Sequence, residues 1–318
     1  MKPELVTFGE TMVIFDPVEK GPLRYVNQFN KRFGGAESNV AIGVSRLGHN
    51  AGWISQVGDE ELGLYLINSI RGEGVDTSQV KMTDEAPTGL YIKERVREGS
   101  NQVYYYRAGS AASRMSKDQI DWDYIKGAKI IHISGITPFL SESCHELTME
   151  VAEFAKEHGI FVSFDPNLRL KIISSFPKHK ETLLRLAGLS DLFMPGIEEA
   201  EYLFGTNDPE TIIQLSLKTG AGQVVLKKGE HGTYYASKEE KGFVKSLRVE
   251  KVVDPIGAGD GFAAGVLSSL LEGRSLKEAV ERGSVVGAMI VTVEGDIEGL
   301  PTVRDINEFL RKKQDVLR

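Results

Sequence analysis

The stretch VVDPIGAGDGFAAGVL (Val252–Leu267) organises the rest of the chain. Its two valines predict the end of a strand, small residues follow, and an apolar run rich in Ala predicts a buried helix. Small residues let a ligand approach the backbone closely, and the free N–H groups at a helix N-terminus bind anions. Asp260 stands among those groups, where the helix dipole favours its ionised form. A carboxylate beside a phosphate pocket can take a proton from an attacking hydroxyl, so the stretch predicts phosphoryl transfer to an alcohol.

The alternative is a glycine-rich strand-to-helix turn with an acid at the helix start and no ligand. Two other phosphate-binding motifs are excluded. The chain contains no GxxxxGK[ST] P-loop, and the third glycine of a dinucleotide-binding GxGxxG would have to stand where Phe262 does.

A second motif lies near the N-terminus: GGAESNVA (Gly34–Ala41), followed by Arg46-Leu47-Gly48 and Gly58-Asp59. This motif, in this order with DPIGAGDGFAAGVL, resembles the two signatures of the PfkB, or ribokinase-like, family of sugar kinases. The resemblance covers nearly the whole chain. It implies one ribokinase-like domain over residues 1–318.

The composition is that of an ordinary globular protein with no preference for nucleic acid. The chain has 38 basic and 45 acidic residues, a net charge of −7. Its single cysteine, Cys144, excludes an internal disulfide and fits a reducing compartment. No run approaches 18 apolar residues, and the first residues lead directly into a strand. We therefore expect a cytoplasmic protein without a membrane partner.

Short apolar runs alternate with stretches of helical periodicity, which predicts an α/β fold with a mainly parallel central sheet covered by helices on both faces. Strands are expected at Leu5–Gly9, Ala51–Val57, Lys129–Ser134, Ile160–Asp165, Asp191–Met194 and Gln223–Lys227. Helices are expected at Asn39–Leu47, Glu60–Arg71, Ser143–His158, Lys178–Leu189, Glu198–Phe204, Pro209–Lys218, Ser275–Val293 and Thr302–Lys313.

Two tyrosine-rich runs predict a β-hairpin: TGLYIKERV (88–96) and NQVYYYRAG (101–109), separated by Arg97-Glu98-Gly99-Ser100. With the segment before Phe33 they predict a small β-sheet standing off the main body, formed from about residues 11–33 and 88–108. In the resembled family such a sheet is the lid over the sugar. The alternative is an edge hairpin of the main sheet.

The resemblance implies roles for the matching residues. Asp260 is the catalytic base, and the N–H groups of Gly257, Ala258 and Gly259 form the anion hole for the γ-phosphate. The sugar lies between sheet and lid, in contact with Gly34, Gly35 and Asn39. ATP binds near the C-terminal motif, and Mg²⁺ bridges its phosphates.

Ligands of open α/β sheets bind beyond the carboxyl ends of the strands. Two stretches follow predicted strands directly, Asp165-Pro166-Asn167-Leu168-Arg169 and Lys227-Lys228-Gly229-Glu230-His231-Gly232. We expect the nucleotide to contact Asn167, Arg169, Lys228, Gly229 and Gly232. The alternatives are a surface cation at Arg169 and a plain hairpin turn from Lys227 into GTYYAS.

The substrate class follows from a finer resemblance. The run YYYRAGSAAS (Tyr104–Ser113), together with GGAESNVAIGVSRLG and DPNLR, resembles the branch of the family that acts on 2-keto-3-deoxygluconate. That substrate is a sugar acid, whose carboxylate Arg107 and Arg169 could clamp with paired N–H donors. Tyr91 and Tyr105 would supply hydroxyls and a flat wall, or pack the lid instead. Asp296 resembles a further substrate-binding acid of this branch, although Gly-Asp is also an ordinary turn.

Two departures from the family pattern affect the cation sites. Many members have Asn in an NxxE motif that assists Mg²⁺, where this chain has Gly196 and retains Glu199. A metal contact of Glu199 through water is the remaining expectation. Pro255-Ile256 replaces a frequent Thr-Thr, so no monovalent-cation site is predicted.

The predicted function is ATP-dependent phosphorylation of the terminal (6-) hydroxyl of 2-keto-3-deoxygluconate. The alternatives are a fructokinase or ribokinase on the same fold, and a non-catalytic sugar-binding protein, since fold does not determine function. We expect a homo-oligomer, a dimer or higher. Acceptance of the 4-epimer, 2-keto-3-deoxygalactonate, is left open.

Overall fold

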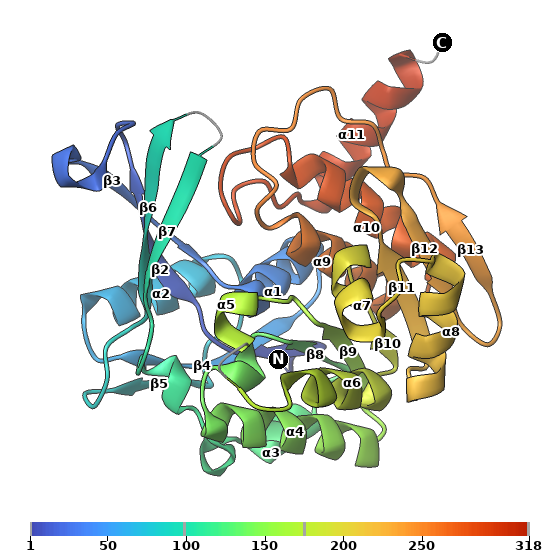
Figure 1. Ribbon diagram of the computed structural model, residues 1–318, viewed down its shortest axis with the longest axis horizontal. Coiled ribbons are helices and arrows are strands. Elements are labelled where there is room, and N and C mark those ends of the chain that lie inside the picture. The colour runs from blue at the N-terminus through green and yellow to red at the C-terminus, as the bar shows by residue number, and fades with distance from the viewer. Residues whose placement is uncertain (1, 98–99, 174–175, 317–318) are drawn as a thin grey trace.

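The computed structural model describes residues 2–97, 100–173 and 176–316 (Figure 1). The strands of its larger sheet are β1 (Leu5–Phe8), β4 (Ala51–Gly58), β5 (Val80–Thr83), β8 (Ile130–Ser134), β9 (Phe161–Asp165), β10 (Leu192–Phe193), β11 (Gln223–Lys227), β12 (Thr233–Ala236) and β13 (Lys241–Val244). Their order across the sheet is β13-β12-β11-β10-β9-β8-β1-β4-β5. Neighbours from β11 to β5 run parallel, and β12 and β13 join antiparallel.

Helices cover both faces of this sheet, as the sequence predicts. Those on one face are α1 (Ala36–Arg46), α2 (Glu61–Gly72), α9 (Ala258–Leu271), α10 (Leu276–Ile290) and α11 (Val303–Val316). Those on the other are α3 (Trp122–Lys126), α4 (Glu142–Glu157), α5 (Leu170–Ile173), α6 (His179–Leu189), α7 (Ile197–Phe204) and α8 (Pro209–Thr219).

The core divides into two layers because side chains alternate along each strand. Leu5 and Ile130 belong to the cluster under α1 and α9, whereas their neighbours Val6 and Ile131 belong to the cluster under α4 and α6. A strand buried on both faces is therefore mainly apolar, and β8 (IIHIS) follows this with one buried histidine, His132, which hydrogen-bonds Ser163 on β9 at 3.1 Å.

A separate small sheet is built from β2 (Met12–Pro17), β3 (Phe29–Gly34), β6 (Leu90–Arg97) and β7 (Ser100–Tyr106), in the order β3-β2-β6-β7. It stands beside the main body in Figure 1, with its strands projecting away from the large sheet. The small sheet expected from the sequence is thus present, and the alternative of an edge hairpin is wrong. Residues 98 and 99 of the expected turn lie outside the described residues.

The main errors of the sequence prediction concern short, exposed segments. No strand ends at Val253: Val252 and Val253 are 58% and 50% exposed, and the N–H of Val253 donates to the carbonyl of Val291. Strands β5 and β13 were not expected. Each lies at one edge of the large sheet and pairs with a single neighbouring strand. An edge strand is less buried than a central one, so its sequence need not be a continuous apolar run.

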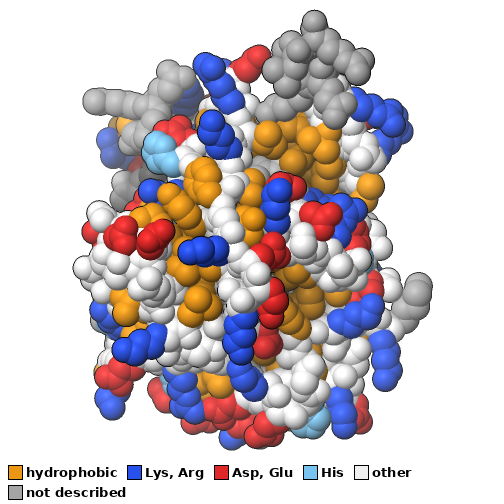
Figure 2. All heavy atoms as spheres, turned by 90° about the vertical axis from the view of Figure 1, so that its right-hand side faces the viewer, with side chains coloured by type: hydrophobic (Ala, Val, Ile, Leu, Met, Phe, Trp, Pro, Cys, Tyr) orange, Lys and Arg blue, Asp and Glu red, His pale blue; other side chains and the backbone are white. Residues whose placement is uncertain are grey.

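The surface in Figure 2 intersperses cationic and anionic side chains, with no large field of one sign on the face shown. Among the described helices, none combines the length and apolar character needed to cross a membrane.

Candidate active site

The N-terminus of α9 is built on a glycine that no other residue can replace without strain. Gly257 has φ of 76°, in the left-handed region that favours glycine. A Cβ atom at Gly257 would lie 2.4 Å from the carbonyl oxygen of Asp296. Around Gly259, by contrast, the described atoms leave open space. The N–H of Ala258 makes a long bond of 3.4 Å to the carbonyl of Pro255, and the open space at Gly259 leaves this end of the helix accessible to an anion.

The two sequence motifs meet at Asp260. Its Oδ2 accepts a hydrogen bond of 2.8 Å from Nδ2 of Asn39, in the first half of α1. This contact requires α1 and α9 to pack closely. A Cβ at Gly43 would lie 2.6 Å from that of Ala264, so the two helices approach where both residues are small. The structure thus brings together a candidate base and a candidate sugar ligand from opposite ends of the chain.

Burial raises the pKa of Asp260 to about 7, against the lowering effect of the Asn39 hydrogen bond. The charge of Asp165 raises this pKa further, and that of Arg169 opposes the rise. Desolvation thus opposes the helix dipole, which was expected to keep Asp260 ionised, and raises its pKa. A carboxylate whose pKa lies near 7 is well matched to general-base catalysis at neutral pH.

Asp296 lies in a loop and contacts a glycine of each motif, Gly34 and Gly257. It is 7% exposed, and a Cβ at Gly34 would lie 2.0 Å from its Oδ2. Burial raises the pKa of Asp296 to about 6, although the Nζ of Lys93, 3.8 Å from Oδ1, acts in the other direction. Lys93 comes from β6 of the small sheet, so an ion pair spans the space between this sheet and the main body. The sequence pattern did not single out Lys93.

Tyr91 and Tyr105 face each other across β6 and β7, with ring centroids 5.5 Å apart. Tyr91 is 7% exposed and packs with Met12 and Ile14, which agrees with the packing role. Burial raises the pKa of its hydroxyl, and Asp296 adds to the rise. Tyr105 is 49% exposed and is the more accessible of the two.

Arg107, at the end of the small sheet, already has a carboxylate partner in the protein. Its Nη2 lies 2.5 Å from Oε2 of Glu10, which is almost fully buried. Ser110 donates a 2.5 Å hydrogen bond to the other carboxylate oxygen of Glu10. The Nε of Arg107 is buried and has no hydrogen-bond partner within the described part of the chain. One edge of the guanidinium is thus held by Glu10, and Nε remains a donor without an acceptor.

The loop after β9 carries Asn167 and Arg169. Asn167 has φ of 41°, an uncommon conformation for a residue other than glycine and one found often at functional sites. The Arg169 side chain is exposed and joins no ion pair among residues 2–97, 100–173 and 176–316. Its charge acts on Asp260, so it lies near the candidate base. No contact joins it to Arg107, and the clamp remains a prediction.

A buried ion pair that the sequence pattern did not single out lies at the same edge of the large sheet. Nζ of Lys227, the last residue of β11, is 2.5 Å from Oδ2 of Asp165, the last residue of β9. Both residues end a run of otherwise uncharged strand residues. A charged residue closing a buried strand is therefore the signal that could have located this pair.

A cleft of about 670 Å³ opens beside the N-terminus of α9. Three of the residues expected at the phosphates or nucleotide line it: Gly229, Ala258 and Gly259. Two others do not. Nζ of Lys228 lies over the ring of Tyr234, 5.9 Å from its centroid, and Gly232 packs against Phe243 and Val244. The lysine on the cleft wall is Lys227, and an antiparallel hairpin of β11 and β12 with a 3₁₀ turn holds these residues.

The far wall of the cleft comes from α10 and the segment after β13, which the sequence analysis did not assign to a ligand. It includes Leu247, Val249, Val252, Ser284, Gly287, Ala288 and Val291. The wall is mainly apolar or small, as expected where a flat base would bind. Val252, one of the two exposed valines that were expected to end a strand, is part of this apolar wall.

Glu199 contacts backbone rather than other side chains. Its Oε1 accepts from the N–H of Leu168 at 2.7 Å, and its Oε2 accepts from the N–H of Gly196 at 2.6 Å. Burial raises its pKa, and the charge of Asp165 adds to the rise. Glu199 thus caps α7 and fixes the loop that carries Asn167. Among the described residues no cluster of three or more carboxylate, His or Cys groups could hold a metal ion by itself.

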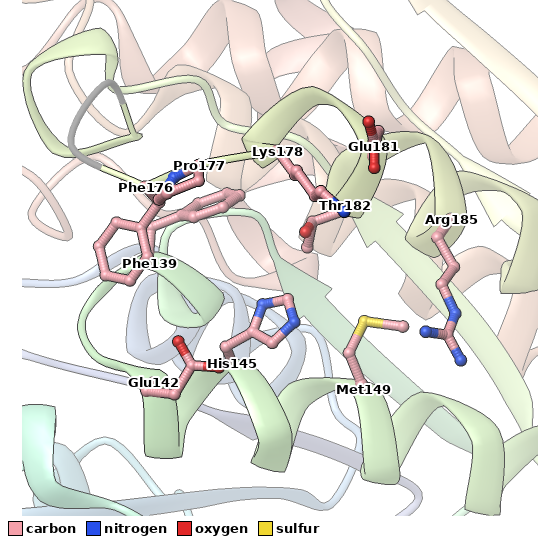
Figure 3. A pocket seen from close by; sticks show the side chains of 10 residues that line it. All are labelled: Phe139, Glu142, His145, Met149, Phe176, Pro177, Lys178, Glu181, Thr182 and Arg185. Atoms are coloured by element: carbon pink, nitrogen blue, oxygen red, sulfur yellow. The ribbon is translucent and has the colours of Figure 1, made fainter.

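A second cavity, of about 370 Å³, lies between α4 and α6 (Figure 3). Its rim combines Lys178 and Arg185 with Glu142 and Glu181, so the fixed charges balance. His145 points into it, whereas Cys144 is buried and donates to the carbonyl of Ala112. None of the residues of the two motifs lines this cavity. The candidate active site is therefore the region of Asp260, and the Cys144–His145 pair forms no nucleophilic site.

Comparison with known proteins identifies a family and several relatives of this chain. Residues 2–303 match the profile of pfkB family carbohydrate kinases. The chain is 44% identical over 317 residues to 2-dehydro-3-deoxygluconokinase of Bacillus subtilis (strain 168), covering 99% of this chain and 98% of the relative. It is 33% identical to the probable fructokinase-6, chloroplastic, of Arabidopsis thaliana, covering 98% and 83%. An E. coli protein assigned to ribokinase II, crystallised with ATP and Mg²⁺, superposes with a TM-score of 0.90 at 27% identity, covering 98% and 99%.

Proposed function

Because the chain belongs to the pfkB family of carbohydrate kinases and is an ATP-dependent sugar kinase, we propose that its acceptor is 2-keto-3-deoxygluconate, phosphorylated on the 6-hydroxyl. This compound is the 2-dehydro-3-deoxygluconate in the name of the B. subtilis relative. The observation that carries the reaction is the Asn39–Asp260 hydrogen bond, which fixes a half-buried carboxylate with a pKa of about 7 beside the open end of α9.

In the proposed reaction, the sugar lies between the small sheet and the large one, with its 6-hydroxyl toward Asp260. Asp260 takes the proton as the hydroxyl oxygen forms its bond to the γ-phosphorus. The bond from that phosphorus to the bridging oxygen breaks, and its electron pair leaves with ADP. The N–H groups at Gly257, Ala258 and Gly259 stabilise the charge on the γ-phosphate oxygens. Asn39 keeps the carboxylate of Asp260 in place.

ATP is proposed to bind in the cleft lined by Gly229, Gly259 and α10, with its phosphates toward Asn167 and Arg169. Mg²⁺ would arrive on the phosphates and keep several waters, as it commonly does. The described residues fit that mode, because they build no metal cage of their own and both oxygens of Glu199 are bonded to backbone. A contact from Glu199 to the ion would run through water.

The sugar-acid assignment rests on cations that face the proposed sugar site. Lys93 and Arg107 enter from the small sheet, and Arg169 from the main body. The Arg107 side chain keeps 14% of its surface exposed, so the part of the guanidinium that Glu10 does not hold could donate to a substrate carboxylate without breaking the Glu10 ion pair. Gly34, Gly35 and Asp296 would contact the sugar hydroxyls, and Tyr105 would cover the ring.

A fructokinase is the second candidate, and one observation favours it. Glu10 compensates the charge of Arg107 and Asp296 that of Lys93, so the net attraction for an anionic substrate falls on Arg169. A neutral ketose needs only hydrogen bonds, which the same groups could supply. The chloroplastic relative is a probable fructokinase at 33% identity.

The deciding experiment measures ADP release by the purified protein with Mg-ATP and one of four additions: 2-keto-3-deoxygluconate, fructose, ribose or no sugar. Turnover confined to the sugar acid supports the proposal. Turnover on fructose or ribose at equal efficiency contradicts it and leaves the role of Asp260 intact. Including 2-keto-3-deoxygalactonate, the 4-epimer, shows whether the enzyme distinguishes the configuration of the 4-hydroxyl.

The substitution Arg107→Lys tests the carboxylate contact while keeping a cation for Glu10. We expect KM for the sugar acid to rise at least tenfold with little change in KM for ATP, since lysine lacks the fork of donors that matches a carboxylate. Tyr106→Phe, at the adjacent last residue of β7, which is 62% exposed, is the control. An unchanged KM for the sugar acid would show that Arg107 does not bind the substrate.

A further inference from the structure

We propose that Lys227 is a further catalytic residue, whose ammonium group binds the phosphoryl group during its transfer. The proposal rests on phosphoryl transfer at Asp260 and not on which sugar is the acceptor. Neither of the two sequence motifs contains this residue. Its position, its partner and the charges around it carry the argument.

Lys227 occupies a place that phosphates reach. It ends β11 at the carboxyl edge of the large sheet, and it lines the cleft together with Ala258 and Gly259. Its backbone is fixed on the side of α7, because its N–H donates to the carbonyl of Pro195 at 2.9 Å and it forms a parallel bridge with Gly196. Gly196, the bridge partner, has no side chain, so it places no group beside the Lys227 amine. Lys227 is the lysine that lines the cleft.

The charges around Lys227 are mainly negative. Asp165 contacts the ammonium directly, and Glu199 and Asp260 act on it at longer range. Burial alone would lower the pKa of Lys227, but these carboxylates outweigh it and hold the pKa above its ordinary value. The carboxylates therefore keep the amine charged, and the side chain, 17% exposed, lines the cleft. A permanently charged, partly desolvated amine interacts strongly with a polyanion.

In the absence of nucleotide, Asp165 is the ion-pair partner of the Lys227 amine and orients it. When Mg-ATP binds, the γ-phosphate offers oxygens of higher charge than a single carboxylate, and Lys227 can bond to both anions because an ammonium group has three donors. As the sugar oxygen bonds to the γ-phosphorus and the bond to ADP breaks, Lys227 stabilises the charge on the transferred group. The proton of the hydroxyl goes to Asp260, so Lys227 neither gains nor loses one.

The first test compares Lys227→Met with Lys227→Arg. We expect Lys227→Met to lower kcat about 10²- to 10³-fold, the loss typical of one donor to a developing charge, with KM for the sugar within threefold of wild type. Lys227→Arg should recover part of the loss because it keeps the charge. Lys241→Met, on the exposed strand β13 of the same sheet, is the control for removing a lysine and should retain wild-type kcat.

A purely structural role predicts a different pattern. Lys227→Met leaves Asp165 buried without a partner, which lowers the melting temperature and could lower activity through misfolding alone. The double variant Lys227→Met/Asp165→Asn removes the unpaired charge. We expect it to regain the melting temperature of Asp165→Asn but not its kcat. Recovery of kcat to that of Asp165→Asn would overturn the proposal.

A readout independent of the sugar separates this proposal from the substrate assignment. Calorimetric titration of wild type and Lys227→Met with Mg-ATP and with Mg-ADP measures the contribution of the γ-phosphate. We expect the variant to bind Mg-ATP about tenfold more weakly and Mg-ADP unchanged. Equal losses for both nucleotides, or no loss for either, would show that the amine does not bind the γ-phosphate.

Discussion

At the scale of single residues, the site depends on carboxylates whose ionisation is set by burial. Asp260 and Asp296 both have a pKa raised toward neutrality, to about 7 and 6. Desolvation is the first cause in each case. A residue that must accept a proton gains from this environment. The pattern agrees with Asp260 as the proton acceptor.

Replacing Asp260 by Asn should lower kcat about 10²- to 10⁴-fold, since a positioned base is lost, with little change in the Kd for sugar or ATP. The side-chain shape and the contact with Asn39 are retained. In wild type, kcat/KM should rise with pH through an apparent pKa near 7, because only ionised Asp260 accepts the proton. Steady-state kinetics from pH 5.5 to 8.5 check both statements. Near-normal turnover by the Asp260→Asn variant would show that Asp260 is not the catalytic base.

The same residue should give a pH-dependent stability difference. Its pKa is higher in the folded protein than the ordinary value of 3.8, so folding favours the protonated form. This contribution to stability is present below pH 4 and is lost as the pH rises to about 7. Asp260→Asn should therefore gain stability relative to wild type over that interval, by at most about 4 kcal/mol at about 1.36 kcal/mol per pKa unit. Urea unfolding at pH 4.5 and 7.5 measures the difference, and a constant difference would contradict the cause.

At the scale of elements, the site is made by the ends of helices and strands. The N-terminus of α9 meets α1 through Asn39, and β9 and β11 end in the ion pair of Asp165 and Lys227. Each element supplies one or two side chains, and rigid packing behind them holds the geometry. The loop that carries Asp296 closes the arrangement, because its backbone contacts Gly257 and its side chain contacts Gly34.

Gly257→Ala should disrupt this arrangement. The substitution is strained by the left-handed φ, and its Cβ would collide with the carbonyl of Asp296 at 2.4 Å. Gly273, at the other end of α9, has φ of 73° and open space around it, so Gly273→Ala is a matched control for the φ effect alone. We expect about 1 kcal/mol of destabilisation for Gly273→Ala with normal kinetics. Gly257→Ala should lose more stability and at least tenfold in kcat/KM; equal effects would show that the contact with Asp296 is unimportant.

At the scale of the whole molecule, the small sheet lies apart from the large one and presents two different faces. Tyr91 and Lys93 alternate with Ile92 along β6, so they share the face toward Asp296. Tyr104 and Tyr106 lie on the opposite face and are 38% and 62% exposed. An exposed tyrosine-rich sheet face is typical of an interface between protein chains. We propose that two copies of this protein pair through it.

Tyr106→Glu should therefore weaken self-association, since it places a charge in the proposed interface. Sedimentation velocity at several concentrations should show a dimer or higher oligomer for wild type and a shift toward monomer for the variant. Phe243→Glu, on β13 of the large sheet and 44% exposed, is the control and should leave the assembly unchanged. A monomeric wild type would contradict the proposal.

The sequence by itself determined the fold class, the small sheet and the location of Asp260. Continuous apolar runs identify strands buried on both faces, and Gly257 marks a turn that needs a positive φ, so local rules were sufficient there. The partners of the charged groups were decided only by tertiary structure. Glu10 occupies one edge of Arg107, Lys227 rather than Lys228 faces the cleft, and burial sets the pKa of Asp260 near 7. Desolvation and long-range ion pairs depend on residues distant in the chain, which no local pattern records.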